Sequence, residues 1–436
     1  MKVKFYTLGC KVNQYESQAM AEQLARHGYE VVTGKEKADV FVVNSCTVTA
    51  SADQKTRQAV RRFKRNNPDS TVVLTGCVPQ AYPEKAKELI EADIVIGNKN
   101  NQVLYTVLEE HFKKGCRVFE VSEHQKGDAF CGDTITCFDE RTRAYIKIQD
   151  GCNRFCSYCV IPYSRGRVRS KPIEEITKEI TALAQKGFKE VVLVGINLSS
   201  YGSDIGRTFP EAVRAANDVN GIVRVRLGSL EPDHLTDEVI EKLAECEKLC
   251  PQFHISLQSG CDKTLKSMNR HYTAEEYRHL CRKLRSTFTD CTVTTDIMVG
   301  FAGENDDDFK KSLSFMEEIG FEKVHVFPYS VRKGTRAEKL TGHNEKSVKE
   351  ERARLMLQKA EEIRREFMEK QVGKTVSVIF ETKTEDGYLT GHTANYTPVK
   401  AKLPEEFQAK LCEVKIVGVE GDCCIGIRNS EFGIRN

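Results

Sequence analysis

The sequence predicts an α/β protein with two regions of parallel strands, followed by a small closed β-barrel. In the first two regions, short apolar runs alternate with helical patterns, which is typical of parallel strands covered by helices. Beyond residue 370 the pattern changes to short strands separated by turns such as Glu385-Asp-Gly387, and this change favours a small barrel. We therefore expect an N-terminal domain at 1–118, a linker at 119–143, a central domain at 144–370 and a C-terminal domain at 371–436.

The composition is typical of a globular protein from a reducing compartment. The chain has 436 residues, of which 40% are hydrophobic and 30% charged, and its net charge of +3 is too small to identify a nucleic-acid-binding protein. It contains 17 Cys, no secretion signal at its start and no apolar run of the roughly 18 residues that a membrane span needs. Many thiols without a secretion signal favour a cytoplasmic protein that binds metal, with no membrane contact.

Three strands of the N-terminal domain end in the same way. Each is followed by a small residue and then a Cys, in Leu8-Gly9-Cys10, Asn44-Ser45-Cys46 and Thr75-Gly76-Cys77. Because the carboxyl ends of parallel strands meet at one edge of a sheet, the three thiols are expected to converge there. Three buried small side chains are the alternative, since Cys is often buried. The repeated register favours an iron–sulfur cluster with one open position, and we call Cys10, Cys46 and Cys77 the N-terminal trio.

A second group of three Cys follows the first expected strand of the central domain, at Tyr145 to Ile148. The segment reads Cys152-Asn-Arg-Phe-Cys156-Ser-Tyr-Cys159, and we call its three Cys the central trio. Three thiolates without a fourth ligand nearby describe a metal site with one open position, where a substrate or cofactor can bind. A structural zinc ion, which would need a fourth ligand, and unligated buried thiols remain the alternatives.

Polar residues and glycines lie at or beyond the ends of the later strands of the central domain. In a barrel of parallel strands these positions all face the same mouth. Each could be a cap or turn residue, but such residues after every strand favour a ligand site. The candidates are Gly195, Asn197, Arg226, Ser229, Glu231, Gln258, Asp296, Ser330 and Arg332.

Two segments are rich in cations. The expected helix at 52–65 carries a basic face, for which a solvated surface is the default interpretation and contact with nucleic-acid phosphates the alternative. The second segment, Arg165-Gly-Arg-Val-Arg-Ser-Lys171, follows the central trio directly.

Several of these motifs resemble those of one enzyme family. The central trio resembles the cluster-binding loop of the radical SAM superfamily, and Tyr6-Thr-Leu-Gly-Cys10-Lys-Val-Asn-Gln-Tyr-Glu-Ser17 resembles the N-terminal signature of its methylthiotransferase branch. Asp296 to Glu304 resembles a glycine-rich motif of that branch, with Ala302 where Pro is usual, and Tyr329 to Thr335 resembles a second motif. The C-terminal domain takes the place of the TRAM module, which binds RNA in the family.

The resemblance implies a partial (β/α)6 barrel and two [4Fe–4S] clusters, one on each trio. It also implies S-adenosylmethionine, bound at the open iron of the central trio and by the polar residues of the mouth. The signature around Cys10 is most similar to enzymes that convert N6-threonylcarbamoyladenosine at position 37 of tRNA to its 2-methylthio derivative. The expected partners are therefore the tRNA anticodon loop and a reducing electron donor, and we expect a monomer.

Three alternatives remain open. The same chemistry could act on isopentenyladenosine in tRNA or on a side chain of a ribosomal protein. The chain could also be a non-catalytic iron–sulfur protein that binds RNA, although such a protein would not need polar groups after so many strands.

Overall fold

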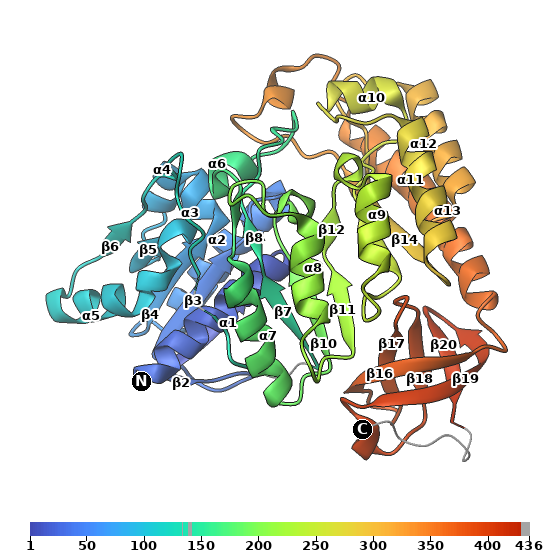
Figure 1. The fold of residues 1–436 in the computed structure, drawn as a ribbon. Helices are drawn as coiled ribbons and strands as arrows, with labels where there is room; N and C mark the ends of the chain where they lie inside the picture. Colours follow the sequence, from blue (N-terminus) through green and yellow to red (C-terminus); the bar gives the residue numbers. More distant parts are fainter. Residues whose placement is uncertain (133, 138–141, 429–436) are drawn as a thin grey trace.

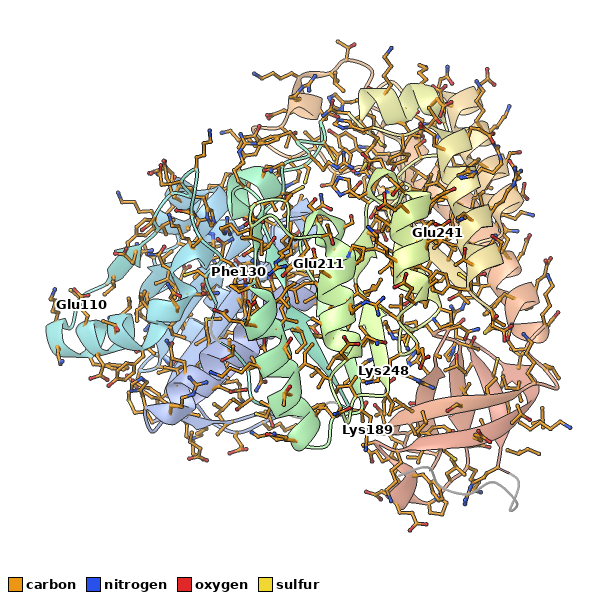
Figure 2. All side chains as sticks on the ribbon, viewed as in Figure 1. Glu110, Phe130, Lys189, Glu211, Glu241 and Lys248 are labelled. Carbon is orange, nitrogen blue, oxygen red and sulfur yellow. The ribbon has the colours of Figure 1, made fainter. Side chains whose placement is uncertain are left out.

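The computed structural model describes residues 1–132, 134–137 and 142–428. An N-terminal sheet covered by helices, a central half-barrel and a small C-terminal barrel follow one another along the chain (Figure 1). The predicted fold class is thereby confirmed. Charged side chains such as Glu110, Glu211 and Glu241 lie on the outer faces of the helices (Figure 2).

The N-terminal sheet has six parallel strands in the order β2-β1-β3-β4-β5-β6. The four predicted strands form its centre, and two short edge strands were not predicted, because their residues are mostly exposed and form no buried apolar run. The later edge strand, β6, begins at the end of the predicted N-terminal domain and extends into the predicted linker. The bounds are β1 Lys2–Thr7, β2 Glu30–Val31, β3 Val40–Ser45, β4 Thr71–Gly76, β5 Ile94–Ile96 and β6 Val118–Glu120.

Helices cover both faces of this sheet. On one face, α1 (Lys11–Arg26) and α5 (Leu104–Lys114) bury Leu24 and Leu108. On the other face, α2 (Ala50–Asn66) and α4 (Pro83–Lys87) pack over the sheet, and α2 buries Val60. The short helix α3 (Cys77–Ala81) lies at the carboxyl edge, directly after β4.

The central region forms a half-barrel of seven strands in two sheets, β11-β10-β7 and β12-β13-β14-β15, with parallel pairing throughout. Six of these strands were predicted. The two-residue strand β12 was not, and it follows β11 after Gly228 and pairs with the other sheet. The bounds are β7 Arg143–Lys147, β10 Glu190–Val194, β11 Arg224–Leu227, β12 Ser229–Leu230, β13 Gln252–Ile255, β14 Thr292–Val299 and β15 Lys323–Pro328.

A layer of helices packs on the outside of the half-barrel, and the largest apolar core lies between the two layers. A two-stranded ribbon, β8 and β9, closes the loop that carries the central trio. The bounds are α6 Ile161–Arg165, α7 Ile173–Gln185, α8 Phe209–Asn217, α9 Asp237–Ala244, α10 Asp262–Ser267, α11 Ala274–Thr287 and α12 Asp306–Ile319, with β8 at Gln149–Asp150 and β9 at Arg169–Ser170.

The long helix α13 (Lys346–Glu369) packs on β15 and leads to the C-terminal barrel, as predicted. This barrel is closed, in the order β16-β17-β18-β20-β19, around a core of its own. The bounds are β16 Thr375–Lys383, β17 Leu389–Thr393, β18 Pro398–Ala401, β19 Leu411–Glu420 and β20 Cys423–Ile427. Within the described ranges, none of the helices has the length and apolar character that crossing a bilayer requires.

Candidate active site

The N-terminal trio lies at the carboxyl edge of the N-terminal sheet. Cys10 immediately precedes α1, Cys46 follows β3 and Cys77 begins α3. Gly9 has φ +98°, and a Cβ atom at this position would lie 2.8 Å from Cys46 Sγ. The absence of a side chain at Gly9 therefore lets the segment before Cys10 approach Cys46, which is the close approach that the small residues predicted.

One asparagine and one arginine link two of these thiols. Cys10 Sγ lies 3.6 Å from Asn13 Oδ1, and the same oxygen accepts a hydrogen bond of 2.7 Å from Arg165. Arg165 Nε points at Cys77 Sγ across 3.3 Å. Asn13 also donates to the carbonyls of Leu8 and Ser45, so that it holds together the two strand ends that precede Cys10 and Cys46.

Arg165 belongs to a buried network of charges between α1 and the central half-barrel. Glu16 on α1 accepts hydrogen bonds from Arg165 and from Lys147, the latter across 2.7 Å. Asp150 lies 2.7 Å from Lys147 and 3.3 Å from Arg169. Three cations thus face two carboxylates, all of them buried, which leaves an excess of one positive charge beside Cys77. A buried excess charge is stable only with a compensating anion, and thiolates that hold a cluster provide one.

The central trio lies on the loop between β8 and α6. The loop is held by hydrogen bonds from Cys152 N to Gly166 O and from Cys159 N to Cys156 O. Two side chains from other strand ends approach its sulfur atoms: Arg270 Nη1 lies 3.3 Å from Cys156 Sγ, and Asn197 Nδ2 lies 3.9 Å from Cys152 Sγ. Nitrogen donors directed at sulfur stabilise the thiolate form that a metal requires.

Burial acts against deprotonation at both trios. It raises the pKa of Cys152 to about 11 and that of Cys46 to about 12, and neighbouring thiols add to both shifts. These thiols are therefore protonated at neutral pH unless a metal displaces the protons. Such thiols are poor free nucleophiles, which favours ligation over direct covalent catalysis.

The short helix α6 connects the two trios. It begins two residues after Cys159 and ends at Arg165, whose side chain contacts Cys77. A five-residue helix is about 7.5 Å long, so the segment that connects the two trios is short. The hydroxyl of Ser164 on α6 also lies 3.3 Å from the carbonyl of Cys77.

A cavity of about 210 Å³ lies between the N-terminal sheet and the half-barrel. Its lining includes Val48 and Thr49, which come shortly after Cys46, and Cys159 of the central trio. Four further residues that the sequence analysis selected line the same cavity: Gln258, Asp296, Ser330 and Arg332. One hollow is therefore lined by the loop that follows Cys46, by Cys159 itself and by the carboxyl ends of the last strands.

Asp296, one of these lining residues, lies close to two histidines. Its carboxylate lies 3.3 Å from His254 Nε2 and 3.4 Å from His325 Nδ1. Burial alone would raise the pKa of Asp296, but the two histidines outweigh burial and hold that pKa well below its usual range. The neighbouring Gln258 has φ +68°, a conformation that non-glycine residues adopt rarely and that is common at functional sites.

Ser330 and Arg332 bind the N-terminal sheet rather than pointing freely into the cavity. The hydroxyl of Ser330 accepts a hydrogen bond from Ala50 N, and Arg332 donates to Thr47 and Asp53 across 2.7 Å each. Arg332 and Asp53 are both buried. These contacts close one wall of the cavity by joining the loop after β15 to the start of α2.

The remaining candidates lie at the other strand ends. Gly195 follows β10 and packs against Gln149, which also binds the backbone nitrogen of Asn197. Glu231 forms an ion pair of 2.6 Å with Arg270, beside Cys156, and Ser229 is exposed at the start of β12.

Arg226 is not brought together with the other candidates. Its guanidinium pairs with Glu190 across 2.9 Å and donates to the carbonyls of Thr393 and Ala394 in the C-terminal barrel. It is fully buried and lies over the ring of Tyr396. The strand pattern could not reveal this role, because the partners lie about 170 residues later in the chain.

Three residues that make important contacts at the site were not selected from the sequence. Arg165 was seen only as part of a basic run, Asn13 only as part of the signature, and Arg270 not at all. The run at 165–171 was noted only as a dense basic segment, and the structure shows that Arg165, Arg169 and Lys171 are buried and ion-paired. Cations that lie so close together can be buried only where carboxylates from another segment pair with them. The sequence of the run itself does not show where those carboxylates are.

Each trio supplies three thiols, which are the donors that iron–sulfur clusters take. Among the residues that the structure describes, no three Cys, His, Asp or Glu side chains are placed so that they could hold a single metal ion together. The donor type of both trios therefore fits an iron–sulfur cluster.

Two family models match the chain. The model of the uncharacterized protein family UPF0004 matches residues 2–97, which include the N-terminal trio, and the model of the radical SAM superfamily matches residues 146–316. The radical SAM match implies one [4Fe–4S] cluster and S-adenosylmethionine. Among solved structures, the radical SAM methyltransferase TsrM from Kitasatospora setae has the same fold with a TM-score of 0.55, at 15% identity over 75% of this chain and 72% of that one.

Curated relatives match nearly the whole chain. A threonylcarbamoyladenosine tRNA methylthiotransferase MtaB from Aquifex aeolicus is 38% identical over 95% of this chain and 100% of its own length. The protein of the same name from Thermotoga maritima is 38% identical over 90% of each chain. A tRNA-2-methylthio-N(6)-dimethylallyladenosine synthase from Alkaliphilus oremlandii is 34% identical over 95% of this chain and 90% of its own. The fold, the central trio and the two matched models define a radical SAM enzyme that transfers a sulfur-containing group. The chain belongs to the radical SAM methylthiotransferase family.

Proposed function

We propose that this enzyme converts N6-threonylcarbamoyladenosine at position 37 of tRNA to its 2-methylthio derivative, with one [4Fe–4S] cluster on each trio. The observation that carries the proposal is the pair of trios, joined by α6, beside a cavity that is lined by Cys159 and by the residues following Cys46. An enzyme that activates a carbon atom and then adds sulfur to it needs both functions within reach of one bound substrate.

The residues of the chain would hold and position the cofactors. Cys152, Cys156 and Cys159 would bind the radical SAM cluster, and Cys10, Cys46 and Cys77 the second cluster. Arg270 and Arg165 would each donate a hydrogen bond to one ligand sulfur. When bound, the clusters and S-adenosylmethionine would supply the one-electron and sulfur-transfer chemistry that an unreactive aromatic C–H bond requires.

An apolar cluster excludes water from one side of this cavity. Phe301, Ala302, Met268 and Tyr329 are buried together, and Tyr158 of the central loop packs against them. A dry wall protects reactive species from solvent and strengthens the polar contacts inside the site. The tight packing of Ala302 also shows that the glycine-rich segment keeps its place without the usual proline.

The charges near Cys10 favour a substrate that carries a carboxylate. Lys11 follows Cys10 directly, and burial together with the nearby Arg143 and Arg226 lowers its pKa to about 8. An anionic group bound beside Lys11 would favour its charged form. The threonylcarbamoyl group is anionic and fits this environment, whereas a dimethylallyl group is neutral and apolar. We further infer that the anticodon loop enters here, that a reducing protein supplies electrons, and that the enzyme acts as a monomer in the cytoplasm.

The test is mass spectrometry of tRNA nucleosides from a strain that lacks the gene. We expect the 2-methylthio form of threonylcarbamoyladenosine to disappear and to return with the wild-type gene. In vitro, Cys152→Ala should abolish the release of 5′-deoxyadenosine. Cys46→Ala should keep that release and lose the methylthio product.

Cys131→Ala is the matched control, because Cys131 is exposed and belongs to neither trio. It should form normal product. Normal product from Cys46→Ala would contradict the assignment of the N-terminal trio as the sulfur source.

The dimethylallyl derivative is the second candidate substrate, because relatives that are 34–35% identical carry the name of that synthase. The same nucleoside measurement separates the two candidates. If the deletion strain keeps methylthio-threonylcarbamoyladenosine and loses methylthio-dimethylallyladenosine, the substrate assignment is wrong and the second candidate is correct.

A further inference from the structure

Helix α2 carries three exposed cations on one stripe. Lys55, Arg62 and Arg65 lie seven and three residues apart, a spacing that places them along one side of the helix. The structure records no ion pair for any of the three among the described residues. All three side chains are exposed to solvent, so none of them is needed to pair a buried carboxylate.

Two other cations of the same helix are paired within the protein. Arg61 pairs with Glu91 across 3.0 Å, and Lys64 pairs with Asp93 across 3.0 Å. Both carboxylates come from the segment before β5, so these two pairs help to hold α2 on the sheet. Lys55, Arg62 and Arg65 differ from them in having no carboxylate partner among the described residues.

The unpaired stripe faces a hollow that has an aromatic side chain at its base. Tyr6 and the three cations of the stripe line this hollow together with the ion-paired Arg61, and its volume is about 410 Å³. The guanidinium of Arg62 lies 5.4 Å from the centre of the Tyr6 ring. Stacked arginine and tyrosine groups are typical surfaces for unpaired RNA bases, and free cations are typical partners of phosphates.

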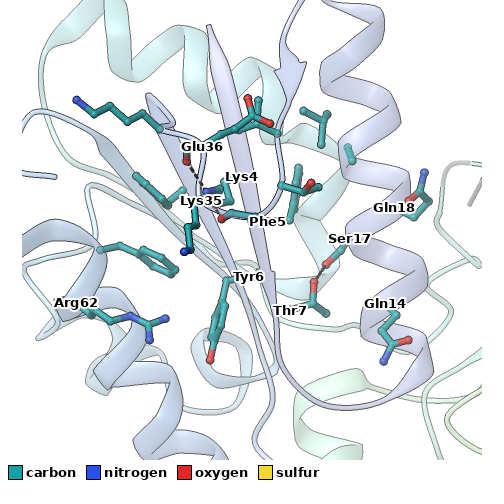
Figure 3. A pocket seen from close by; sticks show the side chains of 18 of the residues that line it. Lys4, Phe5, Tyr6, Thr7, Gln14, Ser17, Gln18, Lys35, Glu36 and Arg62 are labelled. Carbon is teal, nitrogen blue, oxygen red and sulfur yellow. Dashed lines mark hydrogen bonds between the residues drawn. The ribbon is translucent and has the colours of Figure 1, made fainter. Parts of the chain in front are cut away.

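The hollow continues into a larger groove of about 1080 Å³, which shares Tyr6 and Arg62 with it. Lys35 and Arg62 project toward the same space beside Tyr6 (Figure 3). The groove reaches Glu381 and Thr382 of the C-terminal barrel. A continuous surface therefore runs from α2 to the C-terminal barrel.

The same helix begins at the active site. Thr49, which caps α2, lines the cavity that contains Cys159, and Ala50 binds Ser330 on the far wall. From there the 17 residues of α2 extend about 25 Å away from the cavity. A molecule whose reacting base lies in the cavity would bring its flanking backbone along this helix.

We propose that the stripe Lys55, Arg62 and Arg65, with Tyr6, binds the phosphodiester backbone of the substrate tRNA a few nucleotides away from the base that reacts. The proposal rests on the proposed tRNA substrate and adds a contact surface on the N-terminal sheet.

The experiment measures the dissociation constant of full-length tRNA for the anaerobically reconstituted enzyme over a range of salt concentrations. The tRNA carries N6-threonylcarbamoyladenosine at position 37. The triple variant Lys55→Gln/Arg62→Gln/Arg65→Gln should bind on the order of ten-fold more weakly at about 0.1 M salt. The slope of log affinity against log salt should fall by roughly 0.7 to 0.9 for each phosphate that the variant no longer neutralises.

The matched control removes three exposed cations from the outer helices of the half-barrel, in Arg282→Gln/Lys310→Gln/Lys311→Gln. It lowers the net charge equally, so it measures the long-range effect of charge alone. Unchanged iron content and an unchanged melting temperature show that both variants fold. If both triple variants weaken binding equally, or neither does, the proposed surface is wrong.

The wild-type arm separates this inference from the proposed function. If wild-type enzyme binds and modifies the tRNA while the α2 variant behaves like wild type, only the surface proposal fails. If wild-type enzyme neither binds nor modifies the tRNA, both fail. Selective weakening of the α2 variant supports both.

Discussion

Arg165 shows how a single side chain joins two sites. It lies at the end of the loop segment that carries the central trio, yet its guanidinium donates to Cys77 of the N-terminal trio and to Glu16 and Asn13 on α1. The planar guanidinium directs several N–H groups at different acceptors in a fixed fork, a geometry that the single ammonium group of a lysine does not have. Its burial makes each of these contacts strong, because little solvent competes for the donors.

We expect Arg165→Gln to lower the reduction potential of the cluster on the N-terminal trio. A positive charge and an N–H···S hydrogen bond favour the more negative, reduced cluster, and their loss makes reduction harder. The measurement is a redox titration followed by electron paramagnetic resonance, in a chain whose central trio is replaced by Ala so that one cluster contributes.

Arg165→Lys separates the two causes. It keeps the charge and loses the forked geometry, so it should recover part of the shift. An unchanged potential in Arg165→Gln, with full iron content, would show that Arg165 acts only on folding.

At the scale of elements, helix α2 and the loop after β15 close the active-site cavity together. The side chain of Arg332 is bound by Thr47 and Asp53, which lie just after Cys46 and in the first turn of α2. This contact joins the loop after the last strand of the half-barrel to the N-terminal sheet. It also gives Arg332 a positioning role, whereas the sequence had suggested a cofactor contact.

We expect Arg332→Ala to destabilise the protein by about 3 kcal/mol, because Asp53 would remain buried without its partner. The change should lower the midpoint of urea unfolding and reduce product formation, since one wall of the cavity loses its anchor. Arg336→Ala is the control, because Arg336 is exposed in the same loop and should leave the midpoint unchanged. Equal midpoints for the two variants would refute the anchoring role.

Local sequence patterns predicted the strands whose residues are all buried. Every residue of β3 and β4 is buried, and both strands were predicted because such strands read as continuous apolar runs. The edge strands β2 and β6 were missed, since two or three residues at an edge carry no such pattern. The two-residue strand β12 was missed because its pairing with β13 depends on the tertiary structure.

At the scale of the whole molecule, the C-terminal barrel is attached to the half-barrel by arginines on neighbouring strands. Arg224 donates to the carbonyls of Ser377 and His392, and Arg226 to those of Thr393 and Ala394. Arg143 forms an ion pair with Glu381. These contacts set the position of the C-terminal barrel relative to the cavity, and therefore the path available to a large substrate.

We expect Arg226→Ala to cost about 3 kcal/mol of stability while the affinity for S-adenosylmethionine stays unchanged. The reason is that Glu190 would lose a buried partner, whereas nothing places Arg226 in the cavity. Thermal unfolding and limited proteolysis of the C-terminal barrel measure the first effect, and equilibrium dialysis with S-adenosylmethionine the second.

Arg207→Ala serves as the control, because Arg207 pairs with Glu211 on the surface and should contribute less than about 1 kcal/mol. A loss of S-adenosylmethionine affinity without a loss of stability in Arg226→Ala would restore the cofactor role that the sequence suggested.

The sequence by itself determined the fold class, the two trios and the family, because these depend on local signals: apolar periodicity, the spacing of Cys in one loop and the repeated residues after each strand. The tertiary structure alone decided which cations are buried and which are free. Arg165, Arg226 and Arg332 are held by carboxylates and carbonyls from distant segments, whereas Lys55, Arg62 and Arg65 are not. The physical reason is that the cost of burying a charge depends on its partners, and the partners of a charge are set by the fold rather than by its neighbours in the chain.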